Sequence, residues 1–191
     1  VAVDGNRQNG IAQLLKLEDK PEVILLDDAY QHRKVKAGFN ILLTAYYNLY
    51  SNDMVLPTGN LREPRSGAKR ADIIVVTKCT EVISESEKAK ISIDLKVKPH
   101  QRLIFSSINY ADKVISTHSE MALKSLPKFT LVTGIANAKP LVDFLKNKGL
   151  KFNHLEFPDH YSFRVNDIEE LAKKELIITT EKDFVRLADN E

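Results

Sequence analysis

Residues 22–32 read EVILLDDAYQH, and this stretch decides the fold that the sequence predicts. The apolar run 23–26 is short and has polar residues on both sides, which is typical of a buried strand in a parallel sheet. It ends in two adjacent carboxylates, Asp27 and Asp28. Ligands of open α/β sheets bind outside the carboxyl ends of such strands, so we expect a binding site at this pair.

Adjacent carboxylates repel each other, and the usual reason for holding two of them together is a cation. A hard divalent ion such as Mg²⁺ suits carboxylate oxygens. This is the arrangement of a Walker B strand, in which a terminal Asp holds the metal of a bound nucleotide. A single Asp here would more simply cap the next element, but a pair followed by Gln31 and His32 favours a site. His32 could be a metal ligand, a phosphate donor or a hydrogen-bonded surface imidazole.

The bulk properties are those of an ordinary globular protein. The chain has 191 residues, enough for one large domain or two small ones. Its net charge of +2 is too small to argue for nucleic acid, and we expect no nucleic-acid partner. The single cysteine, Cys79, excludes a disulfide within the chain and fits a reducing cytosol. No apolar run approaches the length of about 18 residues that a membrane span needs.

Strand-like runs alternate with helical stretches along the chain, which predicts an α/β fold with parallel crossover units. Strands are expected at residues 1–3, 23–26, 39–44, 73–77, 103–108, 129–133 and 176–179, and helices at about 9–17, 84–97, 140–148 and from 166. The stretch 109–128 is polar and weakly periodic, so we interpret it as the connection between two lobes. We place these lobes at residues 1–112 and 113–191.

The segment LPTGNLREPR (56–65) has prolines near both ends, which predicts a fixed loop. Arg62 and Arg65 could clamp a phosphate, and Glu63 could join a metal site. The alternative is a rigid loop with a surface ion pair.

The segment FPDHYSF (157–163) places Asp159 beside His160 in an aromatic turn. An adjacent carboxylate can fix the tautomer of an imidazole or raise its pKa, and histidine is a natural proton acceptor near neutral pH. The alternative is a hydrogen-bonded loop histidine. Further on, TTEKD (179–183) follows a strand, and its polar side chains could face the same cleft or cap the final helix.

The chain carries a Walker B-like strand without a P-loop. Gly5 and Gly10 have the G-x-x-x-x-G spacing, but Ile11 and Ala12 stand where the motif needs Lys and Ser or Thr. The chain also opens without Met, in what reads as the middle of a strand. We therefore expect a piece of a longer protein whose P-loop lies upstream.

Taken in order, these segments resemble the tetraacyldisaccharide 4'-kinase family, the lipid A kinases of Gram-negative bacteria. The matching segments are VILLDDAYQH (23–32), LPTGNLREP (56–64), VVT (75–77), LVTGIANAKPLVDFL (131–145), FPDHYSF (157–163) and TTEKD (179–183). The resemblance implies a P-loop-kinase-like, mostly parallel sheet, incomplete at its N-terminal side, followed by a smaller α/β lobe. Ala29 departs from the Gly that the family usually has after the two aspartates, and we expect this change to be tolerated.

The resemblance also implies an activity and a site. The reaction would transfer the γ-phosphoryl of ATP to the 4'-hydroxyl of an acylated glucosamine disaccharide 1-phosphate, at the cytoplasmic face of the inner membrane, with membrane contact through the missing N-terminal part. By the family pattern, Mg²⁺ would be bound by Asp27 and Asp28, the nucleotide–metal cleft would be lined by Gln31, His32, Arg62 and Glu63, and the attacking hydroxyl would be activated by His160 held by Asp159. We expect this fragment alone to bind ATP poorly and not to turn over.

Two other classes of function stay open. The first is a non-catalytic nucleotide- or anion-binding module with the same fold. The second is a phosphatase of the haloacid-dehalogenase type, whose Asp nucleophile belongs to an Asp-x-Asp motif after the first strand. The sequence Asp27-Asp28-Ala29 lacks that spacing, so we place the phosphatase last.

Overall fold

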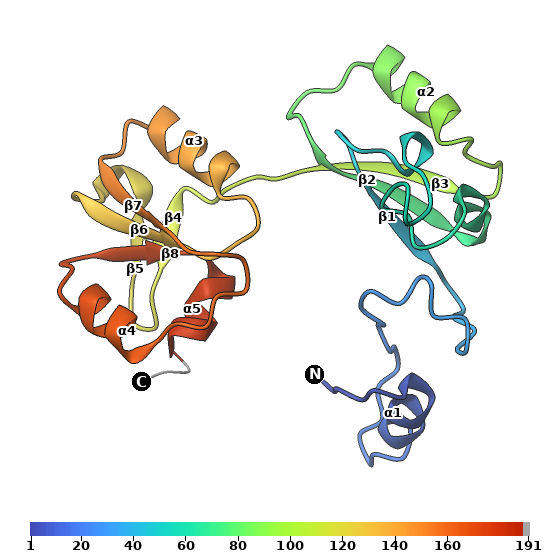
Figure 1. Ribbon diagram of the computed structural model, residues 1–191, viewed down its shortest axis with the longest axis horizontal. Coiled ribbons are helices and arrows are strands. Elements are labelled where there is room, and N and C mark those ends of the chain that lie inside the picture. The colour runs from blue at the N-terminus through green and yellow to red at the C-terminus, as the bar shows by residue number, and fades with distance from the viewer. Residues whose placement is uncertain (189–191) are drawn as a thin grey trace. The chain divides into compact units, whose positions relative to one another are not determined.

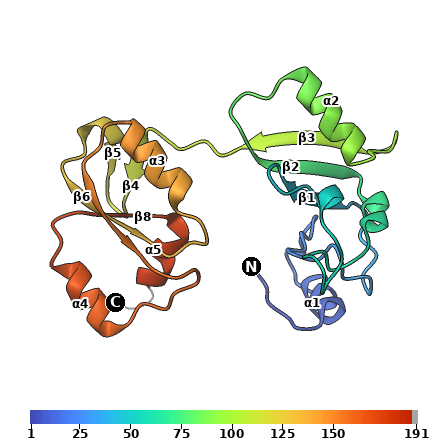
Figure 2. The same ribbon diagram turned by 45° about the horizontal axis from the view of Figure 1, so that its top comes forward.

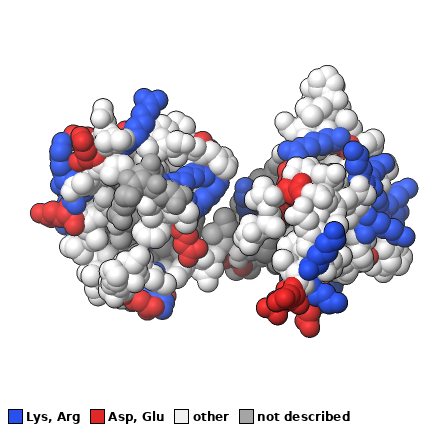
Figure 3. All heavy atoms as spheres, turned by 90° about the horizontal axis from the view of Figure 1, so that it is seen from below, with Lys and Arg blue, Asp and Glu red and all other residues white. Residues whose placement is uncertain are grey.

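The computed structural model describes residues 1–188, and it divides into two compact units, Val1–Ile108 (unit 1) and Asn109–Glu191 (unit 2). Both units combine parallel strands with helices (Figure 1). The α/β class predicted from the sequence is therefore confirmed. On the face drawn in Figure 3, basic side chains are interspersed with acidic ones, in keeping with the net charge of +2.

Unit 1 is built on a three-stranded parallel sheet in the order β1-β2-β3. Its elements are α1 (Arg7–Leu14), β1 (Ile41–Ala45), the short 3-10 helices η1 (Tyr50–Asn52) and η2 (Arg65–Arg70), β2 (Ile73–Cys79), α2 (Glu85–Asp94) and β3 (Arg102–Ser107). The central strand β2 supplies the fully buried Ile74 and Val76, and they belong to one core cluster with Ile91 and Leu95 from α2 and its C-terminal end. Ser84 caps α2, because its Oγ accepts a hydrogen bond from the Glu87 backbone N–H, as its Ser-x-x-Glu sequence predicts.

Unit 2 has a second parallel sheet, in the order β7-β6-β8, and a separate hairpin. Its elements are β4 (Lys113–Ile115), β5 (Glu120–Ala122), η3 (Leu123–Ser125), β6 (Phe129–Thr133), α3 (Lys139–Asn147), β7 (Phe152–Glu156), α4 (Val165–Ala172), β8 (Ile177–Thr179) and α5 (Glu181–Ala188). All five residues of β6 are buried. Leu131 packs in a cluster with Leu145 of α3, whereas its neighbour Val132 packs with Leu171 of α4. Helices therefore cover both faces of this sheet, as Figure 2 also shows.

Two predicted strands are absent from the structure. Residues 1–3 and the Walker B-like run 23–26 form no strand, and Val23 and Leu25 are 72% and 88% exposed. The physical reason is pairing: β1 lies at the edge of its sheet, and neither segment bonds to it or to any other strand of residues 1–188. An apolar run becomes a strand only where a neighbouring strand satisfies its backbone groups.

The prediction for residues 109–128 was also wrong in part. This stretch is not only a connection, because it contains the antiparallel hairpin β4-β5 and the buried Leu123, which packs in the core of unit 2. Strand β7 was not predicted, since only Phe152 and Leu155 are apolar among its five residues. No helix within residues 1–188 is long and apolar enough to cross a membrane.

Candidate functional site

The carboxylate segment, defined here as residues 27–33, contacts the loop of residues 56–65, which carries Arg62 and Arg65. Asp28 and Arg62 form an ion pair, with 3.1 Å between Oδ2 and Nη1. Their side chains are 74% and 64% exposed, so water screens this pair and it contributes little to stability. The structure thus brings together two residues that the sequence analysis assigned to one site, and it leaves both open to solvent.

Glu63 is the most heavily bonded carboxylate of this region. Arg70 donates to it twice, to Oε1 at 2.7 Å and to Oε2 at 3.1 Å, and Arg33 donates to Oε2 at 2.9 Å. Only 15% of the Glu63 side chain is exposed. The hydrogen bonds from Arg70, and then from Arg33, hold the pKa of Glu63 below its ordinary value although burial opposes them. We call this arrangement the Glu63 cluster; in it Glu63 acts as an anchor for two arginines.

The Glu63 cluster fastens the carboxylate segment to η2. Arg70 also donates to the Tyr30 carbonyl at 3.2 Å, and its guanidinium lies 4.8 Å from the centroid of the Tyr30 ring. The Tyr30 hydroxyl in turn donates to the Gly67 carbonyl at 3.0 Å. Burial is the main cause that raises the pKa of Tyr30. Side-chain contacts therefore hold this segment, which directly follows the predicted strand 23–26.

Two glycines allow the loop and the cluster to pack closely. A Cβ at Gly59 would lie 2.3 Å from both the Met54 carbonyl and the Asp53 carboxylate, which accepts hydrogen bonds from the Met54 and Asn60 amides. A Cβ at Gly67 would lie within 2.6–2.8 Å of the Glu63 carboxylate. Neither position has room for a side chain, so both glycines belong to the geometry of the site.

The remaining predicted site residues of unit 1 differ in exposure. Asp27 and Gln31 are exposed and His32 is half-buried, and Asp28 has a positive φ of 43°. No group of three or more His, Cys, Asp or Glu side chains within residues 1–188 could hold a metal by itself. Mg²⁺ is commonly bound through one or two carboxylates together with substrate phosphates and water. The paired carboxylates Asp27 and Asp28 fit that donor set.

In unit 2 a buried carboxylate joins the carboxyl end of β6 to the start of α5. Asp183 has no exposed surface, and it accepts hydrogen bonds from the Gly134 amide at 2.9 Å and the Thr180 hydroxyl at 2.8 Å. Arg186 donates to Asp183 and to the Gly134 carbonyl, each at 3.1 Å. Asp183 therefore serves the structure of unit 2, and Thr180 is linked to it at the start of α5.

His160 lies beside this anchor. The Arg186 guanidinium donates to its Nδ1 at 3.1 Å, and the Lys182 ammonium is 3.5 Å from its Nε2. Asp159 Oδ2 is 3.7 Å from Nε2, which is too long for a hydrogen bond, while Asp159 Oδ1 accepts from the His160 backbone N–H at 3.0 Å. A guanidinium and an ammonium can only donate hydrogen bonds, so both ring nitrogens of His160 face cationic donors.

Sequence reasoning missed the arginines that organise both regions. Arg33 and Arg70 reach Glu63 from 30 and 7 residues away, and no local pattern marks them as partners. Arg186 stands three residues after Asp183 on a helix, and this spacing is a usable signal for an ion pair.

Comparison with known proteins gives a consistent result. A family profile described as "Tetraacyldisaccharide-1-P 4'-kinase" matches residues 1–191. A protein of Flavobacterium johnsoniae named tetraacyldisaccharide 4'-kinase is 51% identical over 100% of this chain and 57% of its own length. Proteins of the same name from Flavobacterium psychrophilum and Bacteroides thetaiotaomicron are 49% and 40% identical, over 99% and 98% of this chain and 57% and 55% of their lengths. This chain thus spans little more than half the length of these relatives. No solved structure matches it.

Replacing Gly59 by alanine should destabilise unit 1, because the added Cβ meets the Met54 backbone at 2.3 Å. We expect a loss of about 1–3 kcal/mol in the free energy of unfolding, the usual cost of overpacking. The free energy of unfolding of unit 1 is measured by urea unfolding followed through NMR resonances of that unit. The matched control is Gly38→Ala, where a Cβ meets nothing within 4 Å and the change should stay within about 0.5 kcal/mol. Equal effects of the two substitutions would contradict the packing described here.

The lowered pKa of Glu63 predicts an acid-dependent contribution to stability. A carboxyl whose pKa is lowered on folding stabilises the fold above its unfolded-state pKa and loses that effect as the pH falls through its folded-state pKa. The free energy of unfolding of wild type should therefore exceed that of Glu63→Gln most at neutral pH, and the gap should narrow at acidic pH. A gap that stays constant over the whole range would show that ionised Glu63 does not stabilise unit 1.

Proposed function

This chain belongs to the tetraacyldisaccharide 4'-kinase family, and we propose that it contributes to the transfer of the γ-phosphoryl group of ATP to the 4'-hydroxyl of an acylated glucosamine disaccharide 1-phosphate. The match of the family over residues 1–191 is the observation that carries this proposal. The names of the relatives give the substrate class, and kinase chemistry supplies ATP as the donor. A P-loop-kinase-like sheet and a place at the cytoplasmic face of the inner membrane belong to the same proposal.

In the proposed reaction, Asp27 and Asp28 would hold Mg²⁺, which would neutralise charge on the phosphates. Both are exposed, and no third His, Cys, Asp or Glu ligand accompanies them within residues 1–188, which suits a metal whose remaining ligands are phosphate and water oxygens. Arg62 forms an exposed ion pair with Asp28 and presents a guanidinium, a group that binds phosphate well. Gln31 and His32 line the nucleotide side of this region.

Glu63 has a positioning role in this proposal. Because Arg33 and Arg70 occupy its carboxylate, it acts by holding the carboxylate segment. The support for this role is the small exposed fraction of Glu63, 15%, compared with 74% for Asp28. The candidate site of unit 1 thus has exposed carboxylates for the ion and one half-buried carboxylate, Glu63, for rigidity.

His160 is the proposed acceptor of the proton from the attacking hydroxyl. Its side chain is 71% exposed, so a substrate can reach it. Arg186 and Lys182 place two cations beside the ring, and Asp159 supplies the opposing charge. To accept the proton of the substrate hydroxyl, a ring nitrogen of His160 exchanges its contact with Arg186 or Lys182 for one with that hydroxyl.

The proposal is tested by phosphorylation kinetics in the full-length protein that carries these residues. We expect Asp28→Asn to lower kcat by at least about 100-fold, the usual cost of losing one electrostatic stabiliser. His160→Gln should lower kcat by about 10²–10⁴-fold through loss of the proton acceptor. The matched controls, Asp143→Asn on α3 and His118→Gln in the hairpin turn, remove exposed residues of the same types and should leave the rate unchanged.

Two outcomes would contradict the assigned roles. Wild-type rates in both Asp28→Asn and His160→Gln would remove these residues from the mechanism. Saturable binding of Mg-ATP by the full-length protein without any phosphorylated disaccharide would favour a nucleotide-binding module over a kinase.

A further inference from the structure

The segment TTEKD at residues 179–183 is only partly explained by the fold of unit 2. Thr179 donates to a carbonyl of β6 at 2.9 Å, and Thr180 exchanges two hydrogen bonds with Asp183 at the start of α5. Asp183 itself is fully buried. These three residues serve the structure of unit 2. The side chain of Lys182, in contrast, is 51% exposed, and its ammonium reaches the turn that follows β7.

The position of Lys182 is not one that helix stability favours. Lys182 is the second residue of α5, which begins at Glu181. The N-terminus of a helix carries a partial positive charge, so carboxylates stabilise it and a lysine does not. The favourable charges of this first turn come from Glu181 and Asp183. The reason for a lysine between them is therefore to be sought outside α5.

Outside α5, Lys182 contacts His160 and its neighbour. The ammonium is 3.5 Å from His160 Nε2 and 3.7 Å from Asp159 Oδ1. Both distances are longer than those of an ordinary hydrogen bond. Because the Asp159 and Lys182 side chains are 36% and 51% exposed, water screens their ion pair and the pair adds little stability. The ammonium is therefore free to move from these two groups to a more negative one.

The proposed reaction brings a strongly negative group to this place. When the attacking hydroxyl gives its proton to His160, its oxygen lies within hydrogen-bonding distance of the ring, about 3 Å. The bond from this oxygen to the γ-phosphorus forms, the bond from phosphorus to ADP breaks, and ADP leaves with the electron pair. The transferring phosphoryl group is then within reach of the Lys182 ammonium, which lies 3.5 Å from the same ring.

We propose that Lys182 is a further catalytic residue, whose ammonium contacts the phosphoryl group during its transfer and neutralises part of its charge. This inference rests on the proposed function, because it takes His160 as the acceptor of the hydroxyl proton. A cation that is already in place beside the transferring group stabilises the transition state more than the bound substrates. It therefore raises kcat and leaves KM nearly unchanged.

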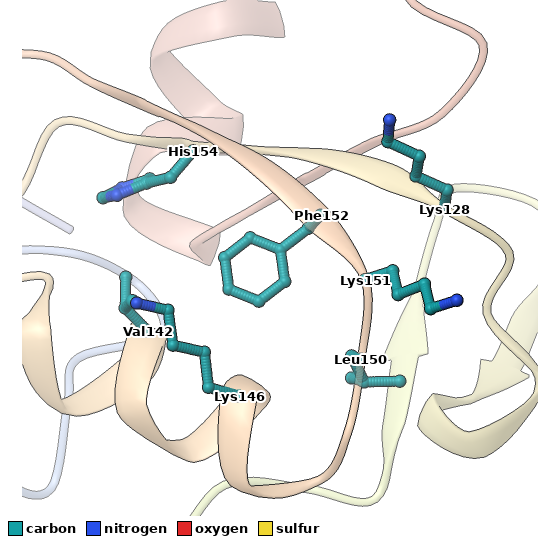
Figure 4. Close-up of a pocket in the computed structure, with 7 residues that line it drawn as sticks. All are labelled: Lys128, Val142, Lys146, Leu150, Lys151, Phe152 and His154. Atoms are coloured by element: carbon teal, nitrogen blue, oxygen red, sulfur yellow. The ribbon is translucent and has the colours of Figure 1, made fainter.

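Other exposed lysines of unit 2 lie away from this place and offer a matched control. Lys128, Lys146 and Lys151 line a pocket between α3 and β7, where their ammonium groups point away from one another (Figure 4). Lys151 directly precedes β7, whereas the turn with His160 follows the carboxyl end of that strand. None of the residues proposed for phosphoryl transfer lines this pocket. Replacing Lys151 thus removes the same charge from unit 2 at the opposite end of the sheet.

The test is phosphorylation kinetics of the full-length protein. Lys182→Gln should lower kcat by about 10²–10³-fold, the usual cost of losing one electrostatic stabiliser. The KM of both substrates should change less than about threefold, because the contact is made in the transition state. Lys182→Arg keeps the charge and should keep kcat within about tenfold of wild type. Lys151→Gln should leave kcat and KM within about twofold of wild type, because its charge is distant and screened.

A second pair of variants separates catalysis from pairing with Asp159. In Asp159→Asn the carboxylate partner of Lys182 is absent, so a lysine that acted only through this pair would have no further effect. We expect Asp159→Asn/Lys182→Gln to have a kcat at least about tenfold below that of Asp159→Asn. Equal rates of these two variants would overturn the proposal, as would a wild-type kcat in Lys182→Gln when His160→Gln is impaired. A wild-type rate in His160→Gln would instead overturn the proposed role of His160, on which the role of Lys182 rests.

Discussion

The two hydrogen bonds from Arg70 to Glu63, reinforced by Arg33, are the interaction on which the candidate site of unit 1 depends. The carboxylate segment has no place in a sheet, so its position rests on contacts with η2 and the preceding loop. Tyr30 is held by the same arginine, through its carbonyl and its ring. If this cluster were lost, Asp28 would keep only an exposed ion pair to Arg62, and an exposed pair is too weak to fix a loop.

The same arrangement of a carboxylate, a glycine and an arginine occurs in both units. In each, a carboxylate with little or no exposure packs against a glycine and accepts hydrogen bonds from an arginine: Glu63 against Gly67 with Arg70, and Asp183 near Gly134 with Arg186. Asp183 is fully buried, so breaking its pair with Arg186 would leave an uncompensated charge. The pair of Glu63 with Arg70 is partly exposed, so breaking it would cost less. Beside each anchor lies an exposed residue assigned a chemical role, Asp28 in unit 1 and His160 in unit 2. Rigid support next to accessible reactive groups is what a site that works by positioning requires.

The sequence predicted the features that local signals determine. The strand at 73–77 and the helices near residues 84 and 140 formed close to their expected bounds, because a hydrophobic run, a Ser cap and an early proline act within a few residues. The strand at 23–26 failed because a strand is completed by its partner, which the run itself does not specify. Residues 56–65 contain no strand and no α-helix, as the prolines predict, and Arg62 of this loop pairs with Asp28. Arg33 lies 30 residues from Glu63, and Arg186 lies 26 residues from His160. Contacts over such distances in the sequence are not marked by composition or local spacing.

Whether Glu63 holds the carboxylate segment is tested most directly by hydrogen exchange of the His32 amide. This amide donates to the Ala29 carbonyl at 2.8 Å within the segment. The Glu63 cluster predicts that Glu63→Gln accelerates this exchange while the amides of β2 keep the protection of wild type. Unchanged exchange at His32 in Glu63→Gln, with β2 equally protected, would show that the segment carrying Asp27 and Asp28 is held by something other than Glu63.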